Sequence, residues 1–223
     1  MQWLGSPLDR LRDGARDYAG RGWRIAPAHY PSAPGWRRLG GRHRPAAGCC
    51  SCRDAGCDRP GAHPLSLKWS TDATADLDTI VYWWYGPQPW NVVLPTGEFF
   101  DVWRAPVDVA GRALESLHAA GAPAGPVAHT PAGAWLLFTG PRLGEPMIDL
   151  PPELPVAHHG DGDYVLAPPS QAAGGAVRWW RPPPAAGTRS PRLPRWEPVA
   201  EALLAAARHR GPGCAVVPVP RAG

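Results

Sequence analysis

The sequence predicts a mixed α+β fold, and three observations support this class. Hydrophobic residues make up 44% of the 223 residues, which is enough to bury a core. Twelve residues are Trp, whereas disordered chains are poor in aromatic residues. Helical and strand-like periodicities alternate along the chain, without an internal repeat. The 30 Pro and 26 Gly residues therefore indicate long loops between the elements rather than a disordered chain.

One helix, one short strand and a long loop are predicted at the start of the chain. Apolar residues at helical spacing predict a helix over 7–20, which Gly20 and Gly22 end. A strand over 23–27 and a loop rich in Pro, Gly and Arg over 30–48 follow.

Strands and helices alternate in the middle of the chain. The aromatic-rich stretch 76–85 is predicted to be helical, with Thr71 and Asp72 as candidate capping residues. The elements expected after it are a strand over 91–94, a turn over 95–98, a strand over 99–103, a helix over 107–120, and strands over 127–130, 135–139, 164–167 and 177–180. Because short connections favour neighbouring strands, we expect the first five of these strands to form one sheet flanked by the two helices.

The chain is expected to form one domain, a linker and a final helix. Residues 1–181 form the domain, with a cysteine-rich loop over 48–64 inserted in it. Residues 182–196 are rich in Pro and Arg, a composition typical of a linker. Residues 197–223 contain a predicted helix over 197–209 and a tail.

The composition excludes several classes of protein. No run of about 18 apolar residues predicts a transmembrane helix, and the first residues lack the basic and apolar segments of a secretory signal. We therefore expect a cytoplasmic protein without a membrane partner. No G-x-x-x-x-G-K-[ST] motif surrounds the single lysine, Lys68, which excludes a P-loop ATPase. A net charge of +4 permits phosphate binding, although a solvated basic surface explains it equally well.

The strongest chemical signal is a cluster of cysteines with one histidine. The pattern C-S-C-x4-C-x5-H offers three thiolates and one imidazole, from Cys50, Cys52, Cys57 and His63. A closed set of four such ligands is typical of structural Zn²⁺, whereas catalytic zinc keeps one position open for water. The tight C-x-C spacing leaves Cys49 as an alternative to Cys50, and free thiols in a loop are the competing interpretation.

Short motifs occur in a fixed order along the chain. They are G-W-R-I-A-P at 22–27, P-G-A-H-P at 60–64, S-T-D at 70–72, N-V-V-L-P-T-G at 91–97, F-F-D-V at 99–102, T-P-A-G at 130–133 and G-D-G-D-Y-V-L-A-P-P-S at 160–170. In this order and spacing, residues 12–181 resemble the N-terminal domain of bifunctional DNA primase/polymerases, the prim–pol domain of the archaeo-eukaryotic primase superfamily.

The resemblance implies a palm related to the RNA-recognition-motif fold, and two-metal nucleotidyl transfer. In this family two acids alternate on one strand, a T-P-S-G-G-x-H hairpin binds the incoming triphosphate, and a third acid precedes a glycine-rich turn. The first acid corresponds to Asp101, but the second position is Trp103. Because alternate residues of a strand share a face, Trp103 would fill the space of the two Mg²⁺ ions, which bind oxygen ligands.

The hairpin motif also departs from the family pattern. Thr130 and Gly133 are kept and are candidate nucleotide-binding residues, but the serine and histidine positions hold Ala132 and Trp135. Trp135 would then close the triphosphate pocket together with Trp103. A side chain of this size buries about 150–250 Å², which favours a packed cleft over a hydrated anion site.

The third acid position falls on Ala157, so the chain keeps one of three catalytic acids. Asp161 remains in the glycine-rich turn as a candidate nucleotide-binding residue, although capping the turn is the ordinary role of such an aspartate. Two-metal catalysis needs several carboxylates. We therefore interpret Asp101 as a vestigial catalytic residue that needs another partner, with Arg104 and Arg178 as candidates.

Three functions remain open. The first is a prim–pol domain that has lost nucleotidyl transfer and still binds DNA, nucleotides or a protein partner in trans. The second is an active primase/polymerase that holds Mg²⁺ with Asp101, Asp161 and either Glu98 or Asp163; Mg²⁺ is expected only in this case. The third is a zinc-stabilised interaction module.

The aromatic and basic side chains do not decide between a nucleic-acid-binding role and a purely structural one. Six residues offer stacking surfaces for bases, although core packing is the usual role of Trp: Trp69, Trp83, Trp84, Trp90, Trp103 and Trp135. Arginines around the linker offer phosphate contacts or form a solvated segment: Arg178, Arg181, Arg189, Arg192 and Arg195.

Overall fold

The computed structural model describes residues 5–32, 36–39, 42–45, 50–146, 148–184 and 193–209. Contacts divide the chain into two compact units, one formed from residues 1–94 and 166–178 and the other from 95–165 and 179–223. The mixed α+β class is confirmed, with antiparallel sheets in both units. The division into a domain over 1–181, a linker and a tail stays a prediction.

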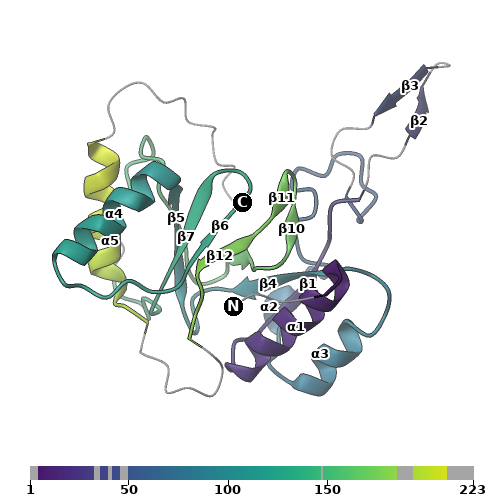
Figure 1. Ribbon diagram of the computed structural model, residues 1–223, viewed down its shortest axis with the longest axis horizontal. Helices are drawn as coiled ribbons and strands as arrows, with labels where there is room; N and C mark the ends of the chain where they lie inside the picture. The colour runs from purple at the N-terminus through teal and green to yellow at the C-terminus, as the bar shows by residue number, and fades with distance from the viewer. Residues whose placement is uncertain are drawn as a thin grey trace. The chain divides into compact units, whose positions relative to one another are not determined.

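Helices and strands alternate along most of the described chain (Figure 1). The helices are α1 (Pro7–Gly20), α2 (Trp69–Asp72), α3 (Leu77–Trp83), α4 (Val107–Ala119) and α5 (Trp196–Arg208). The strands are β1 (Ala26–Ala28), β2 (Trp36–Leu39), β3 (Arg42–Pro45), β4 (Asn91–Pro95), β5 (Asp101–Pro106), β6 (Val127–His129), β7 (Ala134–Thr139), β8 (Ala157–His159), β9 (Tyr164–Leu166), β10 (Gln171–Ala172), β11 (Gly175–Ala176) and β12 (Arg178–Arg181).

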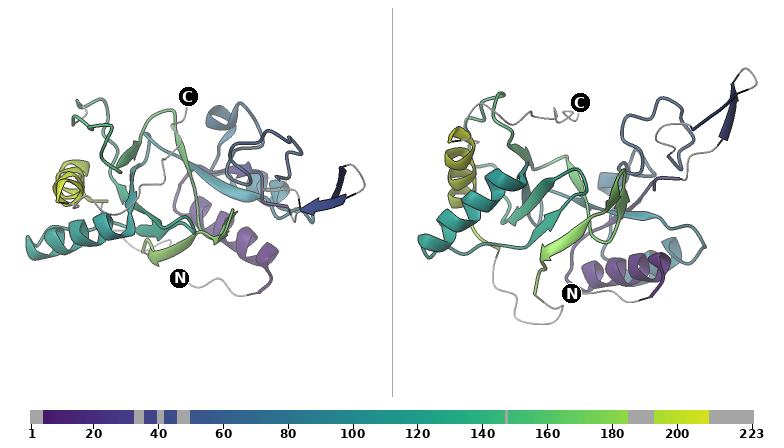
Figure 2. Two further views of the ribbon diagram at one scale, coloured as in Figure 1. Left: turned by 90° about the horizontal axis from the view of Figure 1, so that it is seen from above. Right: turned by 45° about the horizontal axis from the view of Figure 1, so that its top comes forward.

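The first unit contains α1, α3, β1 and most of β4, and β1 pairs antiparallel with β4. Strand β4 lies in a three-stranded sheet of order β1-β4-β9. Ser6 and Asp9 form a capping box at the start of α1, which satisfies backbone N–H groups that the helix leaves unpaired. The buried side of α1 carries Leu11, Ala15 and Tyr18, and this helix packs beside α3 (Figures 1 and 2). The unit therefore buries the apolar stripe that predicted the helix.

The second unit is a five-stranded sheet with two helices on one side. Its strand order is β12-β6-β7-β5-β8, and α4 and α5 lie next to each other on the same side of it (Figure 2). The core between these layers contains Trp103 and Leu137 from the sheet, Val109 and Leu117 from α4, and Leu203 from α5. The predicted helix over 107–120 is thus confirmed as α4, and its apolar side chains face this core.

The prediction of a single sheet is wrong. Strands β4 and β9 pair within the three-stranded sheet, whereas β5, β6 and β7 belong to the five-stranded sheet. The tight turn between β4 and β5 suggested neighbouring strands, but β5 pairs with β7 and β8 instead. Short connections favour neighbours, and here long-range pairing decides the arrangement.

Several local predictions also need correction. The predicted loop over 30–48 contains an antiparallel hairpin, β2–β3. The α3 helix is capped by Asp76, whose carboxylate accepts a hydrogen bond from the Thr79 N–H at 2.8 Å. Thr71 and Asp72 lie in α2 instead. Thr71, Asp72 and Asp76 are all favourable N-cap residues. Residue type alone therefore did not show which of them begins the α3 helix.

Two glycine-containing turns pack on each other in the second unit. The Thr96 N–H donates to the Asp163 carbonyl at 3.0 Å, and the Thr96 hydroxyl donates to the Gly160 carbonyl at 2.6 Å. Gly97 adopts a φ of +100°, and a Cβ there would lie 2.4 Å from Asp161 Cα. Only glycine allows this approach, which explains why a P-T-G turn precedes β5.

Gly97→Ala is expected to destabilise the protein by about 3 kcal/mol, through backbone overlap and a left-handed conformation. Gly133→Ala is the matched control, because Gly133 has a φ of +77° but no atom within 4 Å of its Cβ position. We expect it to lower stability by only about 1 kcal/mol. Urea unfolding measures both, and equal losses would contradict the packing of the two turns.

Candidate metal centre and remnant active site

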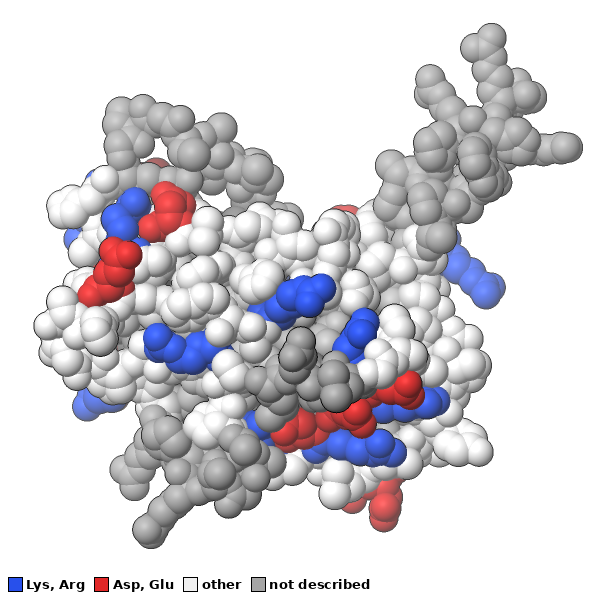
Figure 3. All heavy atoms as spheres, viewed as in Figure 1, with Lys and Arg blue, Asp and Glu red and all other residues white. Residues whose placement is uncertain are grey.

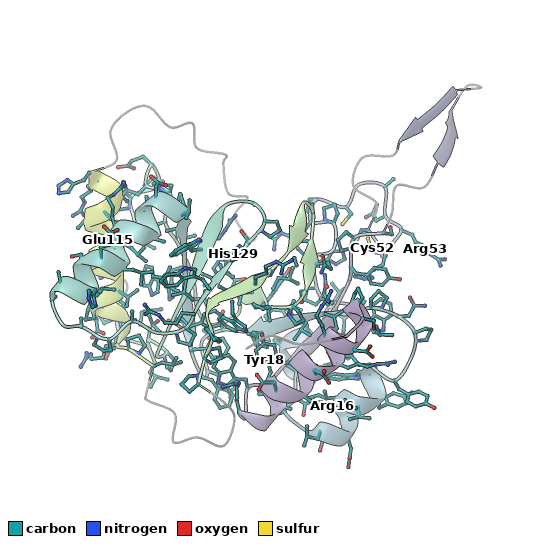
Figure 4. All side chains as sticks on the ribbon, viewed as in Figure 1. Arg16, Tyr18, Cys52, Arg53, Glu115 and His129 are labelled. Atoms are coloured by element: carbon teal, nitrogen blue, oxygen red, sulfur yellow. The ribbon has the colours of Figure 1, made fainter. Side chains whose placement is uncertain are left out.

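Four predicted ligands come together in the first unit. The ligand atoms of Cys50, Cys52, Cys57 and His63 all lie within 4.8 Å of one another, in the segment where Figure 4 labels Cys52. His63 Nε2 is 3.3 Å from Cys50 Sγ and 3.5 Å from Cys57 Sγ. A tetrahedral Zn²⁺ with bonds of about 2.3 Å to sulfur and 2.0 Å to nitrogen separates such atoms by about 3.5 Å. The geometry therefore fits a zinc ion.

The surroundings of the cluster fix the ligands. His63 Nδ1 is 3.2 Å from the Pro64 carbonyl, so its N–H can donate there and leave the Nε2 lone pair for a metal. The Gly61 N–H donates to Cys50 Sγ at 3.3 Å. Gly61 has a φ of +74°, and a Cβ would lie 2.4 Å from Pro31 Cδ. Cys50 lies in the cluster, whereas Cys49, the alternative first ligand, lies outside the described residues.

Asn91 connects this cluster to the sheet and was missed by the sequence analysis. Its side chain is fully buried, and Nδ2 lies 2.7 Å from the Gly61 carbonyl, 3.0 Å from that of His29 and 2.6 Å from that of Gln171. The His29 ring in turn lies 4.4 Å from the His63 ring. Asn91 begins the motif N-V-V-L-P-T-G. An amide directly before an apolar strand was the feature of the sequence that could have indicated a buried polar residue.

The cluster also changes the acidity of its own side chains. Burial raises the pKa of the Cys50 thiol, but hydrogen bonds from the backbone of Cys52 and Gly61 outweigh it and lower the pKa to about 7. Burial raises the pKa of Cys57, which also lies beside Cys50. Burial and the nearby His63 lower the pKa of His29. One thiolate therefore forms readily at neutral pH, as a metal ligand requires.

Asp101 lies on a buried face of the second unit. Its side chain is 1% exposed, and Oδ2 accepts a hydrogen bond from His158 Nε2 at 2.8 Å. The same oxygen accepts the Arg142 N–H at 3.2 Å. Oδ1 has no hydrogen-bond partner among the described residues. The expected partners were wrong, because neither Arg104 nor Arg178 pairs with Asp101 on the described chain. Successive residues of a strand alternate between its faces, so Arg104 lies on the opposite face of β5 from Asp101.

Trp103 shares the face of Asp101, as expected, and this face is packed. Trp103 is fully buried. Its ring centroid lies 6.3 Å from that of Trp196, with 12° between the ring planes, and 4.7 Å from that of His158. Trp196 begins α5. The position of the second acid is thus occupied by an indole between a helix and a histidine.

The family model described as Bifunctional DNA primase/polymerase, N-terminal, matches residues 15–196. The chain belongs to this family. The matched range includes both the Cys/His cluster and Asp101 in the prim–pol domain. Neither a curated protein nor a solved structure matches the chain.

His158 is a second residue of this prim–pol domain whose contact the sequence analysis did not foresee. The expected third acid fell on Ala157, and two histidines follow it. In the sheet, β8 pairs with β5 so that His158 lies opposite Trp103, which brings its imidazole to Asp101. In the sequence, the available indication was a histidine next to the third acid position. Its contact with Asp101 becomes visible only from the register of β8 against β5.

The candidate nucleotide-binding residues lie on two turns of the second unit. Thr130 and Gly133 form the hairpin turn between β6 and β7, where the Gly133 N–H donates to the Thr130 carbonyl at 3.0 Å. This confirms the predicted turn. Asp161 is exposed on the turn between β8 and β9. Nucleotide binding by these residues stays a prediction.

The acids of the alternative catalytic site do not gather around Asp101. Asp163 accepts a hydrogen bond from His159 Nδ1 at 2.6 Å, and both Glu98 and Asp161 are exposed. Over the described ranges, the Cys/His cluster is the one group of three or more such side chains with metal-ligand spacing. No helix in these ranges is long and apolar enough to cross a membrane.

His158→Ala is expected to destabilise the protein by about 3 kcal/mol, since it removes the side-chain partner of a buried carboxylate. His159→Ala is the matched control, because its pair with Asp163 is about one-fifth exposed on both sides, and such a pair contributes about 1 kcal/mol or less. Urea unfolding of both variants tests this. If the two losses are equal, His158 does not hold Asp101.

Proposed function

We propose that this prim–pol domain has lost nucleotidyl transfer and acts as a nucleic-acid-binding domain. One observation carries the proposal: Asp101 is buried against His158 while Trp103 occupies the second acid position. A carboxylate engaged in this way is a structural group, and it is not available to a metal ion without loss of its partner.

The residues present do not fit the two Mg²⁺ ions of the family's chemistry. Mg²⁺ requires oxygen ligands in an octahedral arrangement, and two-metal sites hold ions about 4 Å apart with several carboxylates. The face that bears Asp101 offers Trp103, His158 and the apolar core between the sheet, α4 and α5. No step of nucleotidyl transfer is therefore assigned to this chain.

Family membership and the sheet support the finer parts of the proposal. We infer that the second unit corresponds to the palm, because it has a five-stranded sheet with both helices on one side and carries Asp101, the residue that matches the first acid of the family motif. Two of the six tryptophans offered for stacking, Trp84 and Trp103, are buried and belong to the core. Partly exposed aromatic rings and a net positive charge support contact with nucleic acid.

We also propose that the Cys/His cluster holds one structural Zn²⁺. Three thiolates and one imidazole close the coordination shell, and the Nδ1 contact of His63 orients the ring for Nε2 ligation. The bound ion would stabilise a segment that has no helix or strand of its own between residues 51 and 64, since metal binding and folding are linked.

Elemental analysis of the purified protein is expected to give one zinc per chain. Cys52→Ala should lower both the zinc content and the unfolding midpoint. Asn91→Ala keeps all four ligands but removes the amide that holds Gly61 and His29, and we expect about a 10–100-fold weaker zinc affinity. Cys214→Ala, at a cysteine far from the cluster in sequence, should retain zinc. Zinc-free wild-type protein would refute this part of the proposal.

Primer extension tests the loss of catalysis directly. We expect no template-dependent incorporation of deoxynucleotides by the wild-type protein with Mg²⁺ or Mn²⁺, because the carboxylates that would hold the ions are missing. A catalytically active member of the family, assayed in parallel, serves as the positive control. Extension by the wild-type protein that Asp101→Asn abolishes would overturn the proposal and assign catalysis to Asp101.

A further inference from the structure

An exposed tryptophan pair lies at the edge of the five-stranded sheet. Trp180 belongs to β12, an edge strand, and it is 51% exposed. Its ring centroid lies 4.9 Å from that of Trp135 on β7, with 31° between the planes. The neighbouring Trp179 alternates to the other face and packs 5.2 Å from Phe138. In β12, the Trp179 indole thus packs against Phe138, whereas the Trp180 indole faces solvent.

A positive charge is fixed beside this pair. The Arg181 guanidinium carbon lies 5.2 Å from the Trp180 ring centroid, and its NH1 donates to the Ala124 carbonyl at 3.2 Å. Arg181 is held by this contact and by the ring, a cation–π arrangement. His129, labelled in Figure 4, lies opposite Trp135 in the sheet register, and cross-strand partners share a face.

The surrounding sequence contains no carboxylate to neutralise this charge. Neither 116–144 nor 164–196, the stretches that supply β6, β7 and β12, contains Asp or Glu. The contrast with α1 is clear: Arg12, Arg16 and Arg21 each lie within 4.0 Å of an aspartate of the same helix. Figure 3 shows blue and red side chains alternating there. The charges of α1 are paired, whereas Trp135, Trp180 and Arg181 lie in stretches without acidic residues, which favours anions there.

We propose that Trp180, Trp135 and Arg181 form a stacking platform for single-stranded nucleic acid, a surface we call the tryptophan edge. The proposal rests on the nucleic-acid-binding role proposed above and assigns that role to this surface. Aromatic rings stack on bases of any sequence, and arginine contacts the backbone phosphates. Bases inside a duplex are already stacked and do not expose their faces to such an edge, so an unpaired strand is the ligand that fits.

Fluorescence anisotropy of labelled oligonucleotides tests the proposal on the full chain. The probes are oligo-dT, oligo-rU and a duplex of the same length, which separate DNA from RNA and single from double strands. Trp180→Leu keeps an apolar side chain but removes the ring, and we expect about a 5–100-fold loss of affinity for the single strands. Trp180→Phe retains a stacking face and should recover most of the affinity.

Two further variants keep the result interpretable. Arg181→Gln keeps the ring and removes the charge, and it should lower the slope of log affinity against log salt by about one. Tyr85→Leu, at an aromatic residue that is 82% exposed in the first unit, is the matched control and should bind like the wild type. Unfolding midpoints equal to that of the wild type verify that the variants fold.

Each outcome bears on a different claim. If the wild-type protein binds the single strands and Trp180→Leu binds them equally well, the tryptophan edge is refuted while nucleic-acid binding stands. If Trp180→Phe is as weak as Trp180→Leu, stacking is refuted. If the duplex binds as tightly and depends equally on Trp180, the preference for single strands is wrong. If the wild type binds none of the probes, the proposed function and the platform fail together.

Discussion

Burial of the Asp101 carboxylate limits what the second unit can do. A charged group that leaves water is strongly disfavoured unless it gains partners, and Asp101 Oδ2 gains two, His158 Nε2 and the Arg142 N–H. The indole of Trp103, stacked on Trp196, closes the space beside it. Placing a divalent cation here would require breaking the histidine contact and displacing the ring. Stability and two-metal chemistry therefore compete for the same face, and the packing of α5 on that face favours stability.

Asn91 has a comparable role in the first unit, where one buried amide holds three carbonyl oxygens from separate segments. The four candidate ligands, Cys50, Cys52, Cys57 and His63, do not lie in a helix or a strand, so regular hydrogen bonding does not hold them. The amide replaces that support from the adjacent strand β4. A fully buried polar group with all these contacts contributes strongly to specifying one arrangement, here that of the backbone at Gly61 and His29 beside the Cys/His cluster.

The local features of this chain could be predicted from the sequence, and the long-range features could not. Helical periodicity correctly placed α1 and α4, and ligand spacing correctly grouped Cys50, Cys52, Cys57 and His63. Both depend on residues within 15 positions of one another. The separation of β4 and β9 from β5 depends on which strands pair across the fold. The contact of His158 with Asp101 depends on the register of β8 against β5, which a motif alignment does not specify.

The position of a strand in the sheet also explains why one tryptophan is buried and another is exposed. Trp103 lies on β5, between two neighbouring strands and under α5, so its whole ring is covered. Trp180 lies on β12, which has one neighbour, so one side of its ring meets solvent. An exposed edge strand invites pairing with another chain. Three prolines directly follow β12 and cannot donate the hydrogen bonds that would extend it: Pro182, Pro183 and Pro184. The edge that is open to pairing is therefore short, and the Trp180 indole beside it stays accessible to a base.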